Sequence, residues 1–171
     1  MYDFEEQKEE KILLDGEKML GLSVSDISNK VDKLFCNGQQ KGKLTDDLYY
    51  INLIDKKKYQ LTKNDLQEWG AVLSKDEKWL AYTSEKDMEG SFAIYINKFP
   101  EMNQEIRISS GGGEEPKWMP DGSGVYYRNG SQWMKVKLVL NEEPETPALV
   151  ARFAVFSNEE IYSGLQSGYP L

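Results

Sequence analysis

The residues of this sequence best suited to chemistry are its carboxylates, which occur as adjacent pairs at Asp46-Asp47 and Glu114-Glu115. Paired acids can perform general acid–base catalysis or bind calcium. Neighbouring side chains of a strand point to opposite faces, however, so adjacent acids rarely converge on one substrate. We therefore expect both pairs to lie in solvated loops, and we predict no catalytic residue, no metal site and no cofactor.

The other side chains that carry chemistry are scarce. The 171 residues include no histidine and one cysteine, Cys36. Without histidine the chain lacks the usual general base at neutral pH, the Ser-His and Cys-His nucleophile pairs, and the commonest metal ligand. Cys36 alone forms neither an internal disulfide nor a cysteine zinc site, and we expect it to be a packing residue. This composition excludes most familiar hydrolase mechanisms.

The charge balance and the lack of long apolar runs limit the partners. The chain has 29 acidic and 21 basic side chains, a formal charge of −8, whereas nucleic-acid binding requires clustered lysine and arginine. No stretch approaches the roughly 18 apolar residues of a membrane span. Met1–Lys11 is acidic and polar, unlike a signal peptide. We expect no nucleic-acid partner, no membrane span, and a cytoplasmic location as written, or a periplasmic one if a leader was removed.

The elements that must position these residues are short strands. Apolar and polar residues alternate over brief runs separated by turn signals, which is the pattern of half-buried strands. Two candidate helices, Phe4–Lys11 and Asn158–Leu165, lack a convincing apolar stripe. The predicted strands are Lys18–Val24, Leu48–Ile54, Tyr59–Thr62, Ala71–Leu73, Lys78–Thr83, Phe92–Asn97, Glu105–Ser109, Pro116–Met119, Gly124–Arg128, Gln132–Leu138 and Ala148–Val155.

An internal repeat organises these strands. Leu73–Tyr82 superposes, 45 positions later, on Trp118–Tyr127, and both segments are typical of a strand, a tight turn and a strand. At the same offset, Leu48–Asn52 superposes on Ala93–Asn97. A period of about 40 to 45 residues with four short strands is typical of a propeller blade.

A first copy of the repeat fits less regularly. Ile12–Gly21 matches the same frame, but it lies 61 positions before the second copy. We interpret the polar stretch between Ser25 and Asp46 as the inserted loop that accounts for the extra residues.

The third copy carries a resemblance to a known family. Trp118-Met119-Pro120-Asp121-Gly122, followed by Gly124–Tyr127 and Trp133–Val136, resembles the W-S-P-D-G pattern of TolB-like, WD-like β-propeller repeats. Asp47–Leu53 through Tyr59–Thr62 is similar to the third and fourth strands of such a blade. Gly111–Pro116 is similar to the loop that enters the next inner strand.

The resemblance implies an all-β fold of four-stranded antiparallel blades, about three in this chain. We predict a single unit with blades at 12–69, 70–115 and 116–155, and tails at 1–11 and 156–171. Closed propellers use about four to eight blades. We therefore predict a head-to-tail homodimer that completes a six-bladed ring, and the alternative is that the chain is a piece of a longer propeller.

The resemblance implies a fold far more than a function. TolB-like propellers bind protein partners or accompany hydrolases, whose Gly-x-Ser-x-Gly elbow is missing here. We predict a non-enzymatic scaffold that binds a protein or peptide. One alternative is a carbohydrate-binding or carbohydrate-active propeller whose channel-facing acids and tyrosines are Glu68, Glu115, Tyr82 and Tyr127. Another is a structural fragment of a larger propeller protein.

Partners of propellers usually meet the loops that enter the inner strands and those that link the second strand to the third. In this chain these loops are Asn64–Trp69, Gly111–Glu115, Glu85–Glu89 and Arg128–Ser131. An aromatic and charged recognition patch is predicted there, although both tryptophans could instead wedge between blades. The candidate partner-binding residues are Glu68, Trp69, Glu114, Glu115, Lys117 and Trp118.

Overall fold

Three four-stranded antiparallel sheets make up the computed structural model, which describes residues 19–88, 91–140 and 153–156. Each sheet is a meander whose strands follow one another in chain order, as expected for a propeller blade. Blade 1 contains β1 (Ser23–Ile27), β2 (Lys33–Gln39), β3 (Asp46–Asn52) and β4 (Lys58–Gln60). Blade 2 contains β5 (Glu68–Leu73), β6 (Trp79–Met88), β7 (Ser91–Lys98) and β8 (Ile106–Arg107). Blade 3 contains β9 (Glu114–Trp118), β10 (Gly124–Asn129), β11 (Gln132–Lys137) and β12 (Phe153–Phe156).

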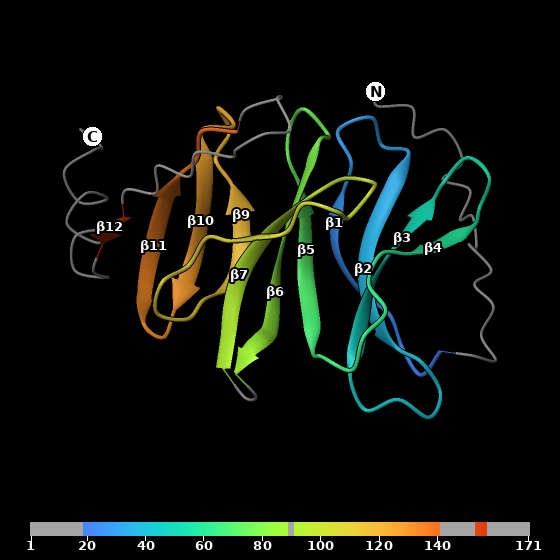
Figure 1. The fold of residues 1–171 in the computed structure, drawn as a ribbon. Coiled ribbons are helices and arrows are strands. Elements are labelled where there is room, and N and C mark those ends of the chain that lie inside the picture. The colour runs from blue at the N-terminus through green and yellow to red at the C-terminus, as the bar shows by residue number, and fades with distance from the viewer. Residues whose placement is uncertain (1–18, 89–90, 141–152, 157–171) are drawn as a thin grey trace, which may run out of the picture.

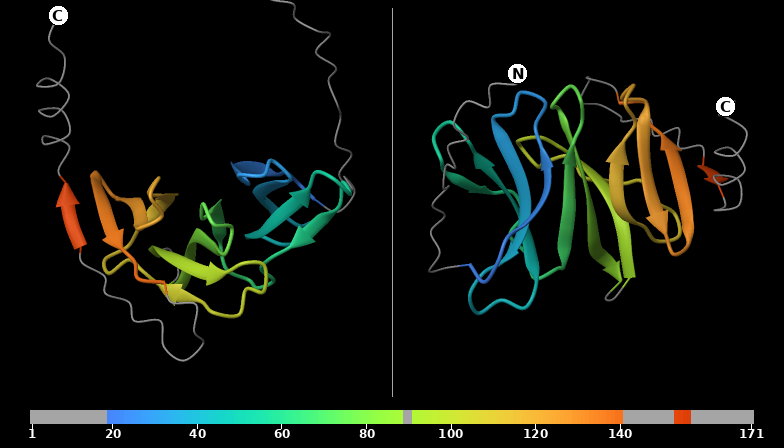
Figure 2. Two further views of the ribbon diagram at one scale, coloured as in Figure 1. Left: turned by 90° about the horizontal axis from the view of Figure 1, so that it is seen from above. Right: turned by 180° about the vertical axis from the view of Figure 1, so that it is seen from behind.

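The blades stand side by side in an open arc (Figures 1 and 2). The first strands of the blades, β1, β5 and β9, are neighbours, and side chains of β1 and β9 each donate a hydrogen bond to the backbone of β5. Ser25 Oγ donates to the Ala71 carbonyl over 2.7 Å, and Trp118 Nε1 donates to the Val72 carbonyl over 3.0 Å. These bonds fix the spacing of the blades along the inner side of the arc.

Apolar cores fill the two junctions between blades. Side chains alternate across each strand, so blade 2, which has a neighbour on either side, is apolar on both faces. Leu80 and Tyr82 face blade 1, whereas Ala81 and Ile96 face blade 3, and all four are buried. The all-β TolB-like architecture predicted from the repeat is therefore what the chain adopts.

A tight turn joins the first two strands of every blade in the same way. The turns span Ser28–Lys33, Ser74–Trp79 and Met119–Gly124, and in each the first residue donates its N–H to the carbonyl of the last over 2.8–2.9 Å. The fourth residue of each turn has a left-handed backbone: Val31 (φ 56°), Glu77 (φ 60°) and Gly122 (φ 74°).

The turns correct the predicted first copy of the repeat. Ser28 precedes its counterpart Ser74 by 46 positions, whereas the prediction placed the first copy at Ile12–Gly21. Residues 12–18 of that copy lie outside the described residues, and Met19 takes part in an isolated bridge with Gln40. The true first turn escaped notice because it has neither the tryptophan nor the Asp-Gly pair of the third.

The predicted inserted loop was also wrong. The stretch between Ser25 and Asp46 contains β2, an interior strand whose Phe35 and Cys36 are fully buried. Its polar residues are compatible with a sheet because they find partners there: Asn37 Nδ2 donates to Asp46 Oδ2 over 2.7 Å. Pairing of the strands thus provides hydrogen-bond partners for polar side chains that the sequence pattern alone placed in solvent.

The other predicted strands overlap observed strands, but Lys18–Val24 shares only Ser23 and Val24 with β1, and Lys78–Thr83 ends five residues before β6 does. Residues 148–152 of the predicted strand Ala148–Val155 lie outside the described residues. The predicted blade boundaries, 69/70 and 115/116, fall inside β5 and β9, so blades 2 and 3 each begin two residues earlier than predicted. The predicted tail 1–11, both candidate helices and all but the first residue of the tail 156–171 lie outside the described residues.

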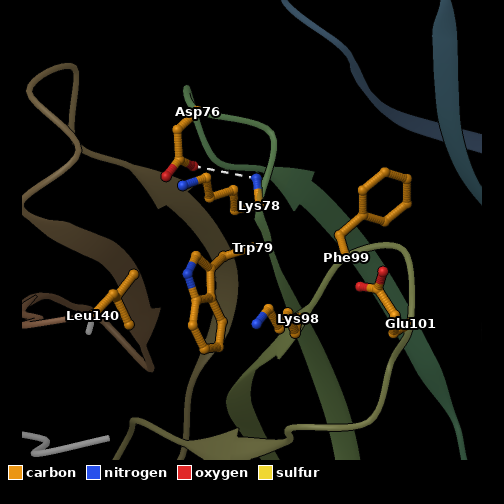
Figure 3. Close-up of a pocket in the computed structure, with 7 residues that line it drawn as sticks. All are labelled: Asp76, Lys78, Trp79, Lys98, Phe99, Glu101 and Leu140. Atoms are coloured by element: carbon orange, nitrogen blue, oxygen red, sulfur yellow. Dashed lines mark hydrogen bonds between the residues drawn. The ribbon is translucent and has the colours of Figure 1, made fainter. Parts of the chain in front are cut away.

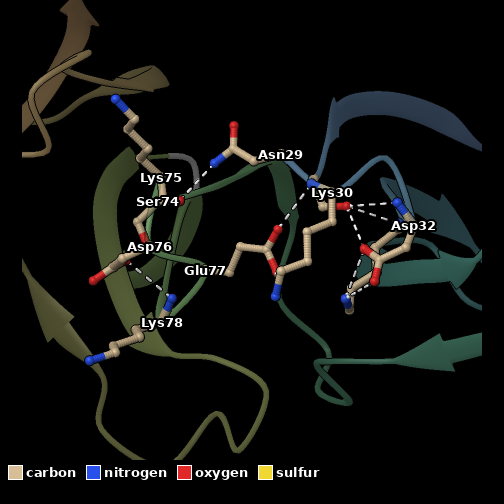
Figure 4. Close-up of polar contacts among 10 residues, drawn as sticks. Asn29, Lys30, Asp32, Ser74, Lys75, Asp76, Glu77 and Lys78 are labelled. Atoms are coloured by element: carbon tan, nitrogen blue, oxygen red, sulfur yellow. Dashed lines mark hydrogen bonds and ion pairs between the residues drawn. The ribbon is translucent and has the colours of Figure 1, made fainter.

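A polar clamp joins the turns of blades 1 and 2 (Figure 4). Asn29 Nδ2 donates to the Lys75 carbonyl over 2.8 Å, and the Lys30 N–H donates to Glu77 Oε1 over 3.2 Å. Lys30 Nζ lies 3.2 Å from Glu77 Oε2. Gly122 occupies the position of Glu77 in blade 3 and has no side chain, so the equivalent contact from this turn position to the neighbouring blade cannot form.

Candidate functional site

The loops predicted to carry a binding site gather at one end of the arc. We call this the loop end, which lies at the bottom of Figure 1, opposite the turns described above. Glu85 donates to the Gln67 carbonyl over 3.3 Å, which joins two of these loops, and Gly113 of a third loop donates to the Phe92 carbonyl at the start of β7 over 2.9 Å. The predicted convergence of these segments is therefore what the geometry provides.

A cavity of about 360 Å³ opens at the loop end between blades 2 and 3. Glycine forms much of its wall, and Gly113 is required because a Cβ there would lie 2.8 Å from the Tyr127 ring. Asn129 Nδ2 donates to the Gly111 carbonyl over 3.1 Å and so ties the β10–β11 turn to the glycine loop. The lining residues are Ser91, Phe92, Gly111, Gly112, Gly113, Glu114, Arg128, Asn129 and Gly130.

Arg128 and Glu114 form the charged side of this cavity, and Glu115 bonds Arg128 beside it. Arg128 Nε donates to Glu115 Oε2 over 3.0 Å, and its guanidinium also bonds Glu114. The hydrogen bonds from Arg128 lower the pKa of Glu115 below its usual range. The pair Glu114-Glu115 lies on β9 and not in the predicted solvated loop, and one arginine bonds both acids.

Trp69 and Phe92 form the aromatic side. Their rings meet edge to face with centroids 6.1 Å apart, and both side chains are half-buried. Phe92 lines the cavity. Trp69, a predicted partner-binding residue, contacts Phe92 from behind the cavity wall. A partly exposed aromatic pair beside a charged group is the composition that protein-binding surfaces favour.

Two other candidates occupy different places. Trp118 packs against the core between blades 2 and 3, so it is the wedge that the alternative interpretation described. Lys117 is exposed on the outward side of blade 3, where it pairs in register with Tyr126. Neither residue lines the loop-end cavity.

The prediction that Glu68 binds a partner was wrong. Glu68 is 1% exposed, faces the junction of blades 1 and 2, and has Ser84 Oγ 3.4 Å from its Oε1. Its Oε2 has no hydrogen-bond partner among the described residues. Burial raises the pKa of this carboxyl. The residue lies at the start of β5, and the alternation of that strand turns it inward.

The tyrosines proposed to face a sugar-binding channel are buried as well. Tyr82 is 0% exposed and Tyr127 is 1% exposed, because each belongs to an interblade core. The Tyr82 hydroxyl bonds Glu105, and burial raises its pKa. Of the four residues proposed for a carbohydrate site, Glu115 alone is exposed.

A second cavity, which the sequence did not predict, lies near the turns. It has a volume of about 400 Å³ and is flanked by Trp79 and Leu140 on one side and by Phe99 on the other (Figure 3). Asp76 at its rim accepts the Lys78 N–H over 3.2 Å, so this carboxylate serves the turn. The remaining lining residues are Lys98 and Glu101.

Neither a metal centre nor a spanning helix is found within the described ranges. No group of three or more cysteine, aspartate or glutamate side chains there is placed to hold a metal ion. No helix in the same ranges is long and apolar enough to cross a membrane.

Sequence reasoning missed Phe92 and the pairing of Arg128 with both glutamates. Phe92 is the second residue of β7 and is half-buried. The sequence pattern predicted a strand there, but it does not indicate that this side chain lines a cavity. Arg128 opens the predicted loop Arg128–Ser131, and its position opposite Glu114 follows from the ladder between β9 and β10. That register could have been inferred only with both strands correctly bounded.

An open arc of four-stranded blades with its loops at one end defines the class as a β-propeller. The chain is similar in structure to a putative TolB from Agrobacterium tumefaciens (TM-score 0.57, 17% identity, 82% of this chain and 47% of that chain covered). It is also similar to TolB from Acinetobacter baumannii (TM-score 0.58, 16% identity, 80% and 33% covered). The fold is therefore TolB-like, and the chain spans less than half the length of each TolB structure.

More distant comparisons add no further name. Hydrazine synthase from Kuenenia stuttgartiensis matches with a TM-score of 0.45 at 16% identity, covering 66% of this chain and 38% of that chain. No family model matches the sequence, and no curated protein matches it.

Proposed function

We propose that the chain is a non-enzymatic propeller scaffold that binds a protein or peptide at its loop end. The observation that supports this most directly is the cavity between blades 2 and 3, where a glycine-walled hollow lies between Arg128 and the Trp69–Phe92 pair. Glycine loops leave backbone groups accessible to an extended peptide, and half-buried aromatic residues supply contact area at little entropic cost.

The charged groups would set specificity at this site. Arg128 already bonds Glu114 and Glu115, so a partner competes with them only by offering comparable hydrogen bonds. Glu115 retains 46% exposure of its side chain and is the acid best placed to meet a donor from a peptide.

The carbohydrate alternative loses most of its proposed residues, because Glu68, Tyr82 and Tyr127 are buried. The structural-fragment alternative makes a different prediction, which is that the loop end binds no ligand. We retain the six-bladed homodimer and both compartments as predictions; the chemistry of the open flanks is considered below.

Peptide selection followed by calorimetry tests the proposal. A displayed random-peptide library is selected on the full chain, and enriched peptides are titrated into wild type, Trp69→Ala and Glu115→Ala. We expect Trp69→Ala to weaken binding about tenfold or more, as loss of an aromatic anchor does. The matched control is Tyr59→Ala, an exposed aromatic on β4.

Two results would contradict the proposal. Equal affinity for wild type, Trp69→Ala and Glu115→Ala would place the peptides elsewhere on the chain. Failure of the library to enrich any peptide, together with binding of glycans on an array, would favour the carbohydrate alternative.

A further inference from the structure

The outward face of blade 3 differs in chemistry from the other described blade faces. We call it the blade 3 flank, and it consists of the residues of β9, β10 and β11 that point away from blade 2. Toward blade 2 the same strands present buried Val125, Tyr127, Met134 and Val136. The flank residues are Lys117, Tyr126, Arg128, Trp133, Lys135 and Lys137.

Strand register places these side chains in rows. Tyr126 pairs with Lys117 on one side and with Lys135 on the other, so two lysines flank one tyrosine across three strands. The next row pairs Arg128 with Trp133, which is 37% exposed, and on its other side with Glu114, whose carboxylate already bonds the guanidinium. The flank therefore combines cations with two aromatic rings.

The equivalent row of blade 2 shows what a covered face requires. Val72 pairs with Ala81, and Ala81 pairs with Ile96, and all three are buried against blade 3. Lys117 and Tyr126 stand where blade 2 has Val72 and Ala81, 45 positions earlier. The flank of blade 3 is thus unsuited to the apolar packing that joins the other blades.

The lysines of the flank are available for a partner. Among the described residues, none of Lys117, Lys135 and Lys137 has a carboxylate within ion-pair distance; Lys135 Nζ lies 5.7 Å from the centroid of the Tyr126 ring. Covering these ammonium groups without supplying opposite charges would be strongly unfavourable. A partner of the flank must therefore bring carboxylates, together with apolar groups for Tyr126 and Trp133.

A second copy of the chain does not supply that surface in the ring arrangement. Head-to-tail packing would set the outward side of blade 1 on the flank. Cys36, Tyr49 and Ile51 on that side are already buried, with Met19 and Leu22 among the apolar residues packed against them. The carboxylate on its β3 strand, Asp47, is 1% exposed and bound to Lys43. The two faces are chemically mismatched.

We propose that the blade 3 flank binds an acidic polypeptide segment, whose carboxylates pair with Lys117, Lys135 and Lys137 while its apolar side chains contact Tyr126 and Trp133. This surface shares Arg128 with the loop-end cavity, but Lys117, Lys135 and Lys137 do not line that cavity. A variant that changes only these lysines therefore tests this proposal independently of the first. Charge complementarity of this kind raises the association rate and selects the partner.

Fluorescence anisotropy with a labelled peptide of alternating glutamate and tyrosine tests the proposal on the full chain. The test variant is Lys117→Glu/Lys135→Glu, and the matched control is Lys41→Glu/Lys57→Glu, which changes the net charge equally on exposed lysines of blade 1. We expect the test variant to weaken binding about tenfold or more and the control to weaken it less than about twofold. Both variants are first checked for the circular dichroism of wild type.

Other results would overturn the proposal. Equal weakening by both double variants would mean that only net charge matters, and absence of measurable binding by wild type would remove the site. Binding of a heparin oligosaccharide or duplex DNA as tightly as the peptide would identify a general polyanion surface. A dimer of wild type that the test variant dissociates would assign the flank to self-association.

Discussion

Glu68 is a carboxylic acid that the fold removes almost entirely from water. It is buried between blades 1 and 2, and burial raises its pKa above the ordinary value of 4.5. Between the unfolded and the folded pKa, the native state binds more protons than the unfolded state. The contribution of Glu68 therefore favours folding at low pH and is lost as the pH rises through the folded pKa.

Replacing Glu68 with glutamine removes the charge and keeps the shape. We expect Glu68→Gln to be more stable than wild type at pH 7, by on the order of 1 kcal/mol, with the difference shrinking as the pH falls toward 4.5. Urea unfolding across this pH range measures it. The control is Glu101→Gln, an exposed glutamate; a pH-independent difference between Glu68→Gln and wild type would show that Glu68 is not the titrating group.

The residue scale is also where prediction of the site succeeded least. Trp69 and Trp118 have similar sequence surroundings, each next to a glutamate or lysine, yet one stands at a cavity wall and the other wedges between blades. Their roles depend on how far each lies along its strand from the loop end. That distance is set by strand bounds and bulges, which the sequence pattern does not define.

At the scale of elements, the recurring turn keeps its backbone while its residues change. The left-handed position is held by valine, glutamate and glycine in the three blades. Glycine takes this conformation readily, whereas a β-branched residue is strained there. Val31 is 62% exposed, so its side chain contributes little packing to offset the strain.

We expect Val31→Gly to stabilise the chain by about 1 kcal/mol, because relief of strain exceeds the added freedom of the unfolded chain. The reciprocal change, Gly122→Val, should destabilise by a similar amount, since a Cβ at Gly122 meets no atom within 4 Å and only the backbone is affected. Urea midpoints measure both. As a control, Val24→Gly, in an exposed strand position with 61% exposure, should lower stability.

The strands of blades 2 and 3 could be predicted because turn dipeptides and alternating apolar residues agree there. Blade 1 was predicted poorly for a physical reason. Its β2 strand carries Asn37 and Gln39 among apolar residues. Its first turn depends on a hydrogen bond that the Lys33 N–H donates to Ser28 Oγ over 3.0 Å. Ser74 Oγ accepts from the Trp79 N–H over 2.9 Å in the same way, so a serine spaced by 46 was the available signal.

At the scale of the whole molecule, the question is how an arc of three blades meets its surroundings. The apolar face of blade 1 and the lysine-bearing flank of blade 3 do not complement each other. The head-to-tail dimer predicted from blade counting would therefore join two unlike faces, and it stays a prediction.

Sedimentation equilibrium at micromolar concentration tests this dimer: a mass of one chain, 19.7 kDa, would contradict it, and twice that mass would support it. Blade 1 also presents exposed Leu20, Val24 and Ile27, so the measurement should include a concentration series to detect association through that face. A stable species of twice the mass that persists in Lys117→Glu/Lys135→Glu would support pairing through blade 1.

The single thiol of the chain can report how fast blade 1 opens. Cys36 is fully buried on β2, and burial raises its pKa to about 11. A thiol reagent at neutral pH can therefore modify the chain only while this part of the blade is open. When the reagent reacts faster than the blade recloses, the labelling rate equals the opening rate, and the dynamics of one blade become measurable in the intact arc without adding a probe.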